Sequence, residues 1–229
     1  MMFKGIIKAA LAGTLLLGLA GTAQSATIEW FSTGVDDSSN ALSGGATDTH
    51  YTVAFNGGSA QSAVVVDPGH PNWIAPPANS RWIGVSPSNT TDSVGTYTFS
   101  TSFDLTGFNL STAEFSFNWS SDNESVVKLN GTTITSLAHF ENGLNAWAQL
   151  KSYVYDSDLD LLVDGVNTLT FEVENAVCGG KCLNPTGLLV SGLGGTISAV
   201  PVPAALPLLA AALGGLGFLS ARRRRASAA

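Results

Sequence analysis

The chain has 229 residues, and its 10 basic and 17 acidic residues give a formal net charge of −7 at pH 7. Six of the basic residues lie near the two ends, so the segment 27–199 keeps four basic and 17 acidic residues, a charge of −13 (4 − 17). Such a surface repels a phosphate backbone, which argues against nucleic acid as a partner. The acidity suits either solubility or the binding of cations.

The first 26 residues have the layout of a secretory signal peptide. Lys4 and Lys8 precede an uncharged apolar stretch, 9–20, and small residues suited to cleavage follow at 23–26. The apolar stretch is shorter than the ~20 residues that a bilayer span needs, which argues against an uncleaved anchor. We therefore expect an exported protein whose signal peptide spans 1–26.

Strict alternation of apolar and polar residues marks three segments of the body: 95–105, 113–119 and 167–175. This period of two is typical of half-buried strands. Asn130-Gly131 lies between two further apolar segments and predicts a hairpin, and turn residues also occur at Gly57-Gly58 and Asp164-Gly165. The pattern predicts one all-β domain over 27–199, a β-sandwich.

Segment 140–154 is the best helix candidate, but Gly143 and its β-branched end weaken it. We expect a loop there, with one turn at most, leading into a strand. Cys178 and Cys182 enclose a short glycine-rich segment, and in an oxidising compartment they predict a small disulfide loop. A metal site would need more thiols or nearby histidines.

No common catalytic motif occurs in the sequence, so we do not expect an enzyme. The histidines are His50, His70 and His139, and a Ser-His-Asp triad assembled from distant positions stays an open alternative. Paired carboxylates would suit glycoside hydrolysis, but nothing singles out one pair.

Carbohydrate binding is the sharper hypothesis, because sugars need flat aromatic faces together with amide or charged groups. Two loop-like stretches supply these types, and the candidate sugar-binding residues are Trp73, Asn79, Arg81 and Trp147. Trp82 and Trp119 fit the core, and for Trp73 both an exposed and a buried position stay open.

Calcium is the second ligand considered, because carboxylate and amide oxygens close in sequence suit a hard cation. The candidates are Asp36 with Asp37, and Asp122 with Asn123. An Asx turn into the following strand is a structural alternative for the second pair. An EF-hand over 156–160 is rejected because Leu161 stands where that motif needs glycine.

Ala204–Ala221 has 18 uncharged residues, which as a helix would extend about 27 Å at ~1.5 Å per residue and just span a hydrocarbon core. The basic run that follows places the tail in the cytoplasm and the folded part outside. The three parts of this segment resemble the PEP-CTERM class of bacterial sorting signals in its VPLPA variant, except at Val202, where that variant has leucine. They are Val200, Pro201, Val202, Pro203 and Ala204; the apolar span; and Arg222, Arg223, Arg224 and Arg225.

This resemblance implies recognition by an exosortase-type protease, cleavage near the proline motif and delivery to the cell surface or extracellular matrix. The membrane would hold the chain only during sorting, as an inner-membrane-anchored intermediate. The sorting signal is expected over 200–225.

The body also resembles a galactose-binding-like jelly-roll domain of exported PEP-CTERM-type proteins. The matching motifs are FSTGVD, GATDTHY, NWIAPPANSRWI, GTYTFSTSFDLTGF, SSDNESVVKLNG, GVNTLTFEVEN and NPTGL. The resemblance covers nearly all of 27–199 and implies fold and setting without an activity. The cysteine loop looks like an insertion in it.

Together these observations predict an exported jelly-roll β-sandwich of the extracellular matrix that binds exopolysaccharide without turnover. A structural matrix or coat component without a defined ligand is the alternative, and a polysaccharide hydrolase is the less favoured one.

Overall fold

The computed structural model describes residues 25–28, 30–155, 159–177, 179, 184–200, 212–214 and 216. The β-rich compact unit spans Gln24–Val200. The two cysteines and nearly all of the predicted signal peptide and sorting signal lie outside the described residues. Those assignments stay predictions. Within the described part of the chain, no helix is long and apolar enough to cross a bilayer.

The unit is built from strands and one short 3₁₀ helix. They are β1 (Ser25–Thr27), β2 (Thr47–Phe55), β3 (Gln61–Val65), β4 (Ile83–Gly84), β5 (Gly95–Asp104), β6 (Phe108–Asp122), β7 (Ser125–Leu129), β8 (Thr132–Leu137), β9 (Phe140–Glu141), β10 (Leu144–Asn145), η1 (Ala146–Ala148), β11 (Lys151–Val154), β12 (Val166–Asn175) and β13 (Gly187–Ala199). β1 includes two residues that the sequence assigned to the signal peptide, and it pairs with the end of β13.

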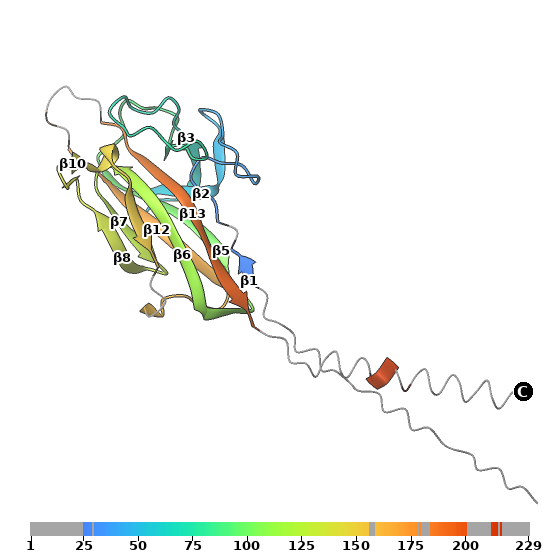
Figure 1. The fold of residues 1–229 in the computed structure, drawn as a ribbon. Coiled ribbons are helices and arrows are strands. Elements are labelled where there is room, and N and C mark those ends of the chain that lie inside the picture. Colours follow the sequence, from blue (N-terminus) through green and yellow to red (C-terminus); the bar gives the residue numbers. More distant parts are fainter. Residues whose placement is uncertain are drawn as a thin grey trace, which may run out of the picture. The chain divides into compact units, whose positions relative to one another are not determined.

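The strands form two layers. The hydrogen-bonded order is β11-β6-β13-β4-β3-β2-β5-β12-β7-β8, with β1 beside β13. Figure 1 shows β6 and β13 lying across β5 and β12, and the short β3 and β4 join the two layers along one edge. The structure confirms the predicted all-β sandwich of the jelly-roll type.

The predicted alternation fills the space between the layers. In β5 and β12, alternate residues are buried, and the two strands pair from Asp104↔Val166 to Gly95↔Asn175. Phe117 of β6 meets Phe171 of β12 edge to face, with ring centroids 5.6 Å apart. Trp82 and Trp119 are 1% and 0% exposed, which confirms both as core residues.

The predicted turns are present where positive φ angles are needed. Asn130 and Gly131 have φ angles of 50° and 83° between β7 and β8, and Asn56 and Gly57 have 47° and 70° between β2 and β3. Asn and Gly tolerate this left-handed region. The hairpin predicted at Asn130-Gly131 is confirmed, whereas the turn predicted at Gly57-Gly58 lies one residue earlier, at Asn56-Gly57. The apolar segment before Asp164-Gly165 forms no strand in its described part, 159–165.

Segment 140–154 is the predicted loop with one turn and a following strand. The turn is η1 and the strand is β11. The small β9–β10 hairpin before them, closed at Asn142-Gly143, was not expected from the sequence.

Candidate functional site

A pocket of about 280 Å³ opens where β6 ends and β13 begins. Its described lining combines aromatic rings, amides and a carboxylate: His70, Asn72, Asp122, Asn123, His139, Trp147 and Asn184, with Ala176, Val177 and Pro185 as apolar wall. We call it the end pocket. It gathers loop residues that are more than 100 positions apart in the sequence.

Trp73 lies beneath the end pocket instead of forming an open platform. It is 7% exposed, and its ring stacks on Trp82 with centroids 4.3 Å apart. A Cβ on Gly187 would lie 2.6 Å from its Cη2 atom, so β13 approaches the ring as closely as glycine allows. Trp73 is therefore buried and not exposed, and its small accessible part lines a hollow of about 190 Å³ beside the end pocket.

Trp73 also fixes the carboxylate of the pocket. Its indole N–H donates to Asp122 Oδ2 at 2.6 Å, and Asn123 Nδ2 donates to Asp122 Oδ1 at 2.7 Å. Asn123 Oδ1 accepts from the Ala176 N–H at 2.8 Å. Burial raises the pKa of Asp122 to about 6, although the bond from Trp73 opposes this shift. The Asp122 carboxylate is thus bound to side chains, and it makes no Asx turn into β7.

Trp147, unlike Trp73, is only half-buried. Its ring meets the His139 ring edge to face, with centroids 5.1 Å apart. Its inner side packs against the buried cluster of Trp73 and Trp82. Its backbone carbonyl accepts from the Ile74 N–H at 2.8 Å, which ties its loop to the loop that carries Trp73.

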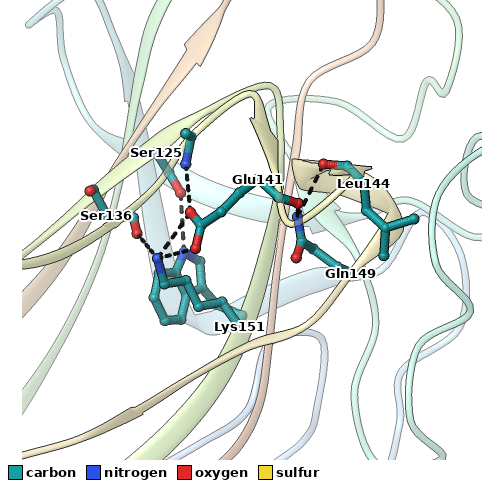
Figure 2. A network of polar contacts seen from close by, with 8 residues as sticks. Ser125, Ser136, Glu141, Leu144, Gln149 and Lys151 are labelled. Carbon is teal, nitrogen blue, oxygen red and sulfur yellow. Dashed lines mark hydrogen bonds and ion pairs between the residues drawn. The ribbon is translucent and has the colours of Figure 1, made fainter.

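A polar network around Lys151, Glu141 and Gln149, drawn in Figure 2, connects the residues on either side of Trp147 in the sequence. Lys151 Nζ lies 2.7 Å from Glu141 Oε1 and 2.8 Å from the Ser136 carbonyl oxygen. The hydrogen bond from Lys151 holds the pKa of Glu141 below its usual value. Gln149 Nε2 donates to the carbonyls of Glu141 and Leu144, at 3.1 and 3.3 Å. Lys151 also connects β11 in one layer with β8 in the other.

The other sugar-binding candidates lie beside the end pocket. Arg81 lines a neighbouring hollow of about 190 Å³ that shares His70 with the end pocket. Its Nη1 donates to the Ser80 carbonyl at 2.7 Å, and its Nε lies 3.7 Å from Asp67 Oδ2. Asn79 is exposed and lines neither hollow. The structure therefore places Trp147 in the end pocket, Trp73 and Arg81 together in the neighbouring hollow, and Asn79 in neither.

The first calcium candidate pair belongs to a different loop. Asp36 Oδ1 accepts hydrogen bonds from the backbone N–H groups of Ser38 and Asn40. The hydrogen bonds from Asn40 are the main reason why the pKa of Asp36 is lowered. Asp37 Oδ1 lies 3.3 Å from His50 Nε2. In the described ranges no three His, Cys, Asp or Glu residues form a group that could hold a metal ion.

Four pocket residues were not identified as binding residues from the sequence: His70, His139, Asn72 and Asn184. Within the described part of the chain, neither the Asn72 nor the Asn184 side-chain amide has a hydrogen-bond partner. From the sequence, His70 and His139 are candidates only for catalysis. Loop residues follow no periodic pattern, so no sequence signal places these four together.

No protein-family model matches the chain, and no curated protein matches it. Among solved structures it is similar to an FMN-binding beta-glucuronidase from Facaelibacterium prausnitzii L2-6, with 16% identity and a TM-score of 0.36, over 74% of this chain and 23% of that one. It is also similar to a beta-glucosidase from Kluyveromyces marxianus in complex with glucose, with 14% identity and a TM-score of 0.34, over 83% and 19%.

A family 35 carbohydrate binding module from an environmental isolate shows 16% identity and a TM-score of 0.29, over 65% of this chain and 98% of the module. The chain spans about a fifth of the length of the two enzymes. At such low scores and identities, these likenesses say nothing about which ligand this chain binds.

Proposed function

We propose that the domain binds carbohydrate without turnover, and that the end pocket is the binding site. The observation that carries this proposal is the half-exposed Trp147 ring in one pocket with the unpartnered amides of Asn72 and Asn184. A pyranose presents an apolar C–H face and a rim of hydroxyls, and an indole with amides complements both. The imidazoles of His70 and His139 add polar groups that bind neutral hydroxyls.

The rigidity of the base supports the same proposal. Asp122 and Asn123 are held by Trp73 and by the Ala176 N–H, so the polar floor is in place before a ligand arrives. A site that is already ordered loses less conformational entropy on binding.

The composition of the pocket favours binding over hydrolysis. Among its described lining residues, Asp122 is the one carboxylate. Most glycoside hydrolases use two carboxyl groups, separated by roughly 5 to 10 Å across the scissile bond. A lone, largely buried carboxylate hydrogen-bonded to an indole suits a floor better than a proton shuttle.

The proposed setting is outside the inner membrane. It rests on the signal peptide, the apolar span with its arginine run and the acidic body, as read from the sequence. An exosortase-type protease and, transiently, the membrane are the proposed processing partners. Exopolysaccharide of the extracellular matrix is the proposed ligand.

Binding to an array of immobilised glycans tests the proposal. Trp147→Ala should weaken binding of a glycan held in the end pocket at least tenfold, because the stacking face is lost. Phe108→Ala is the matched control, since Phe108 is also a partly buried aromatic residue but lies at the far end of β6. Equal affinity of both variants and the parent protein, or no binding to any glycan, would contradict a carbohydrate site and favour a structural matrix component.

A further inference from the structure

A second pocket lies on the side of the sandwich, between β2 and β5. Its volume is about 330 Å³, and it shares no lining residue with the end pocket. The described pairing of the two strands runs from Thr52↔Ser100 to Phe55↔Tyr97 and does not continue toward the start of β2. The strands therefore separate beyond this point, and the gap between them is the side pocket.

The walls of the side pocket combine rings with hydroxyls. Phe31 and His50, which both line it, stack nearly parallel, with centroids 3.6 Å apart and an interplanar angle of 9°. Hydroxyl side chains line it as well: Thr49, Thr52, Ser100, Thr101 and Ser102. Within the described residues the hydroxyls of Thr49 and Thr101 have no hydrogen-bond partner.

One residue that lines this pocket, Trp30, carries an unsatisfied donor. The Trp30 ring lines the pocket and packs on Phe103 and Phe115, with centroids 4.1 and 4.3 Å away. Its indole N–H is buried and has no acceptor among the described residues. A buried donor without a partner is unfavourable in a folded protein. A ligand oxygen that enters between the lining side chains would supply the missing acceptor.

The charge of the side pocket restricts its ligand. Among the described residues that line it there is no Lys, Arg, Asp or Glu, and burying a charged ligand group without a counter-charge is strongly unfavourable. Rings together with free hydroxyls fit an uncharged polyhydroxylated ring. From this geometry we propose that the side pocket is a second carbohydrate site, specific for a neutral sugar unit.

Two separate sites on one rigid domain would let each molecule hold two polysaccharide segments. Because each segment carries many repeats, the complex would become a cross-linked network and gain avidity from the second contact. This consequence rests on the function proposed for the end pocket. Occupation of the side pocket does not rest on it.

Calorimetric titration of the full chain with neutral gluco-, galacto-, manno- and xylo-configured tetrasaccharides measures the number of sites. Thr52→Tyr should fill the side pocket, since Thr52 is an exposed strand residue that lines it. Thr47→Tyr is the matched control, being exposed on the same strand outside the pocket. Trp30→Phe keeps a ring but removes the N–H, and should weaken side-pocket binding about fivefold.

We expect two sites per chain in the parent protein and in Thr47→Tyr, and one site in Thr52→Tyr and in Trp147→Ala. Turbidity of a mixture with soluble polysaccharide should disappear in both one-site variants. The second site alone would be overturned if Thr52→Tyr bound as many sugars per chain as the parent protein. It would also be overturned if the parent had one site and only Trp147→Ala lost it. Binding lost in Thr52→Tyr and retained in Trp147→Ala would support it and contradict the function of the end pocket. No binding to any tetrasaccharide would overturn both.

Discussion

Trp73 and Trp147 lie in loops around the same pocket, but they are supported in different ways. Trp73 is enclosed by Trp82, Gly187 and the carboxylate of Asp122. Trp147 is only partly buried: it packs against that cluster, meets His139 and lines the pocket. Its loop depends on polar contacts to Lys151. Trp73 therefore helps to build the support of the pocket, whereas Trp147 is accessible to a ligand.

The difference shows why residue type alone is a poor guide to a binding site. A buried indole such as Trp73 contributes mainly packing and one hydrogen bond. A partly exposed indole such as Trp147 is less costly to remove and more accessible to a ligand. Mutations at the two positions should therefore affect different properties of the protein.

The largest effect on stability should come from Trp73→Ala. It removes a buried ring and leaves the Asp122 carboxylate without its indole donor, so we expect a loss of about 3 to 5 kcal/mol in the free energy of unfolding. Trp147→Ala should lose about 1 kcal/mol, because part of its ring is already solvated. Urea denaturation of both variants measures the two losses in the free energy of unfolding. Similar losses would contradict the expected difference between Trp73 and Trp147.

The next effect is a pH dependence due to Asp122. Its pKa is raised from 3.8 to about 6 in the folded protein, so the folded state holds the proton more tightly than the unfolded chain does. The contribution of Asp122 to the free energy of unfolding is therefore largest below about pH 4. It falls as the pH rises to about 6 and is then constant. A shift of about two pKa units corresponds to about 3 kcal/mol.

Asp122→Asn should remove this dependence. The stability of the variant relative to the parent should rise by up to about 3 kcal/mol between pH 4 and pH 7, measured by denaturation at each pH. The raised pKa values of Asp48 and Asp92 act equally in both proteins, so they cancel in the difference. A difference that does not vary with pH would show that Asp122 titrates normally.

A smaller effect is expected where β13 passes Trp73. Gly187→Ala places a methyl group 2.6 Å from Trp73 Cη2 and 3.1 Å from Trp82 Cε3, and should lower stability by about 2 kcal/mol. Gly194→Ala on the same strand is the control, because nothing lies within 4 Å of its added Cβ. Thermal unfolding should rank the two variants, and equal midpoints would mean that the Trp73 ring moves aside easily.

The smallest effect should come from the network beside Trp147. Lys151→Met keeps the side-chain stem but removes the contacts to Glu141 and Ser136, and should lower stability by about 1 kcal/mol or less. Glycan affinity should fall with it, because the Trp147 loop loses support. Lys128→Met, which breaks the ion pair with Glu172 away from the pocket, should leave affinity unchanged. Equal glycan affinities of the two variants would show that the Lys151 network does not contribute to binding in the end pocket.

The sequence predicts the strands of this fold better than its loops. Alternation identifies β5, β6 and β12 because half-buried strands repeat every two residues, and Asn130-Gly131 identifies a hairpin because its φ angles favour those residues. It also places Trp119 in the core. The short β9–β10 hairpin has too few residues to show a period.

The end pocket could be predicted only in part. The sequence identifies Trp147, Asp122 and Asn123, but for separate ligands and not as one site. The contact between Trp73 and Asp122 joins residues 49 positions apart, and β13 reaches the same ring from Gly187. No local pattern encodes such a meeting, so neither the burial of Trp73 nor the presence of His70 could be inferred from neighbouring residues.

The length of β13 has a mechanical consequence. Its first residue, Gly187, touches Trp73 under the end pocket, and its last residue, Ala199, precedes the point where the chain leaves the β unit. Its 13 residues span roughly 40 Å at ~3.3 Å each. A tensile load between a bound ligand and Val200 would run along this strand and load its hydrogen bonds to β6 together in shear instead of peeling them one at a time.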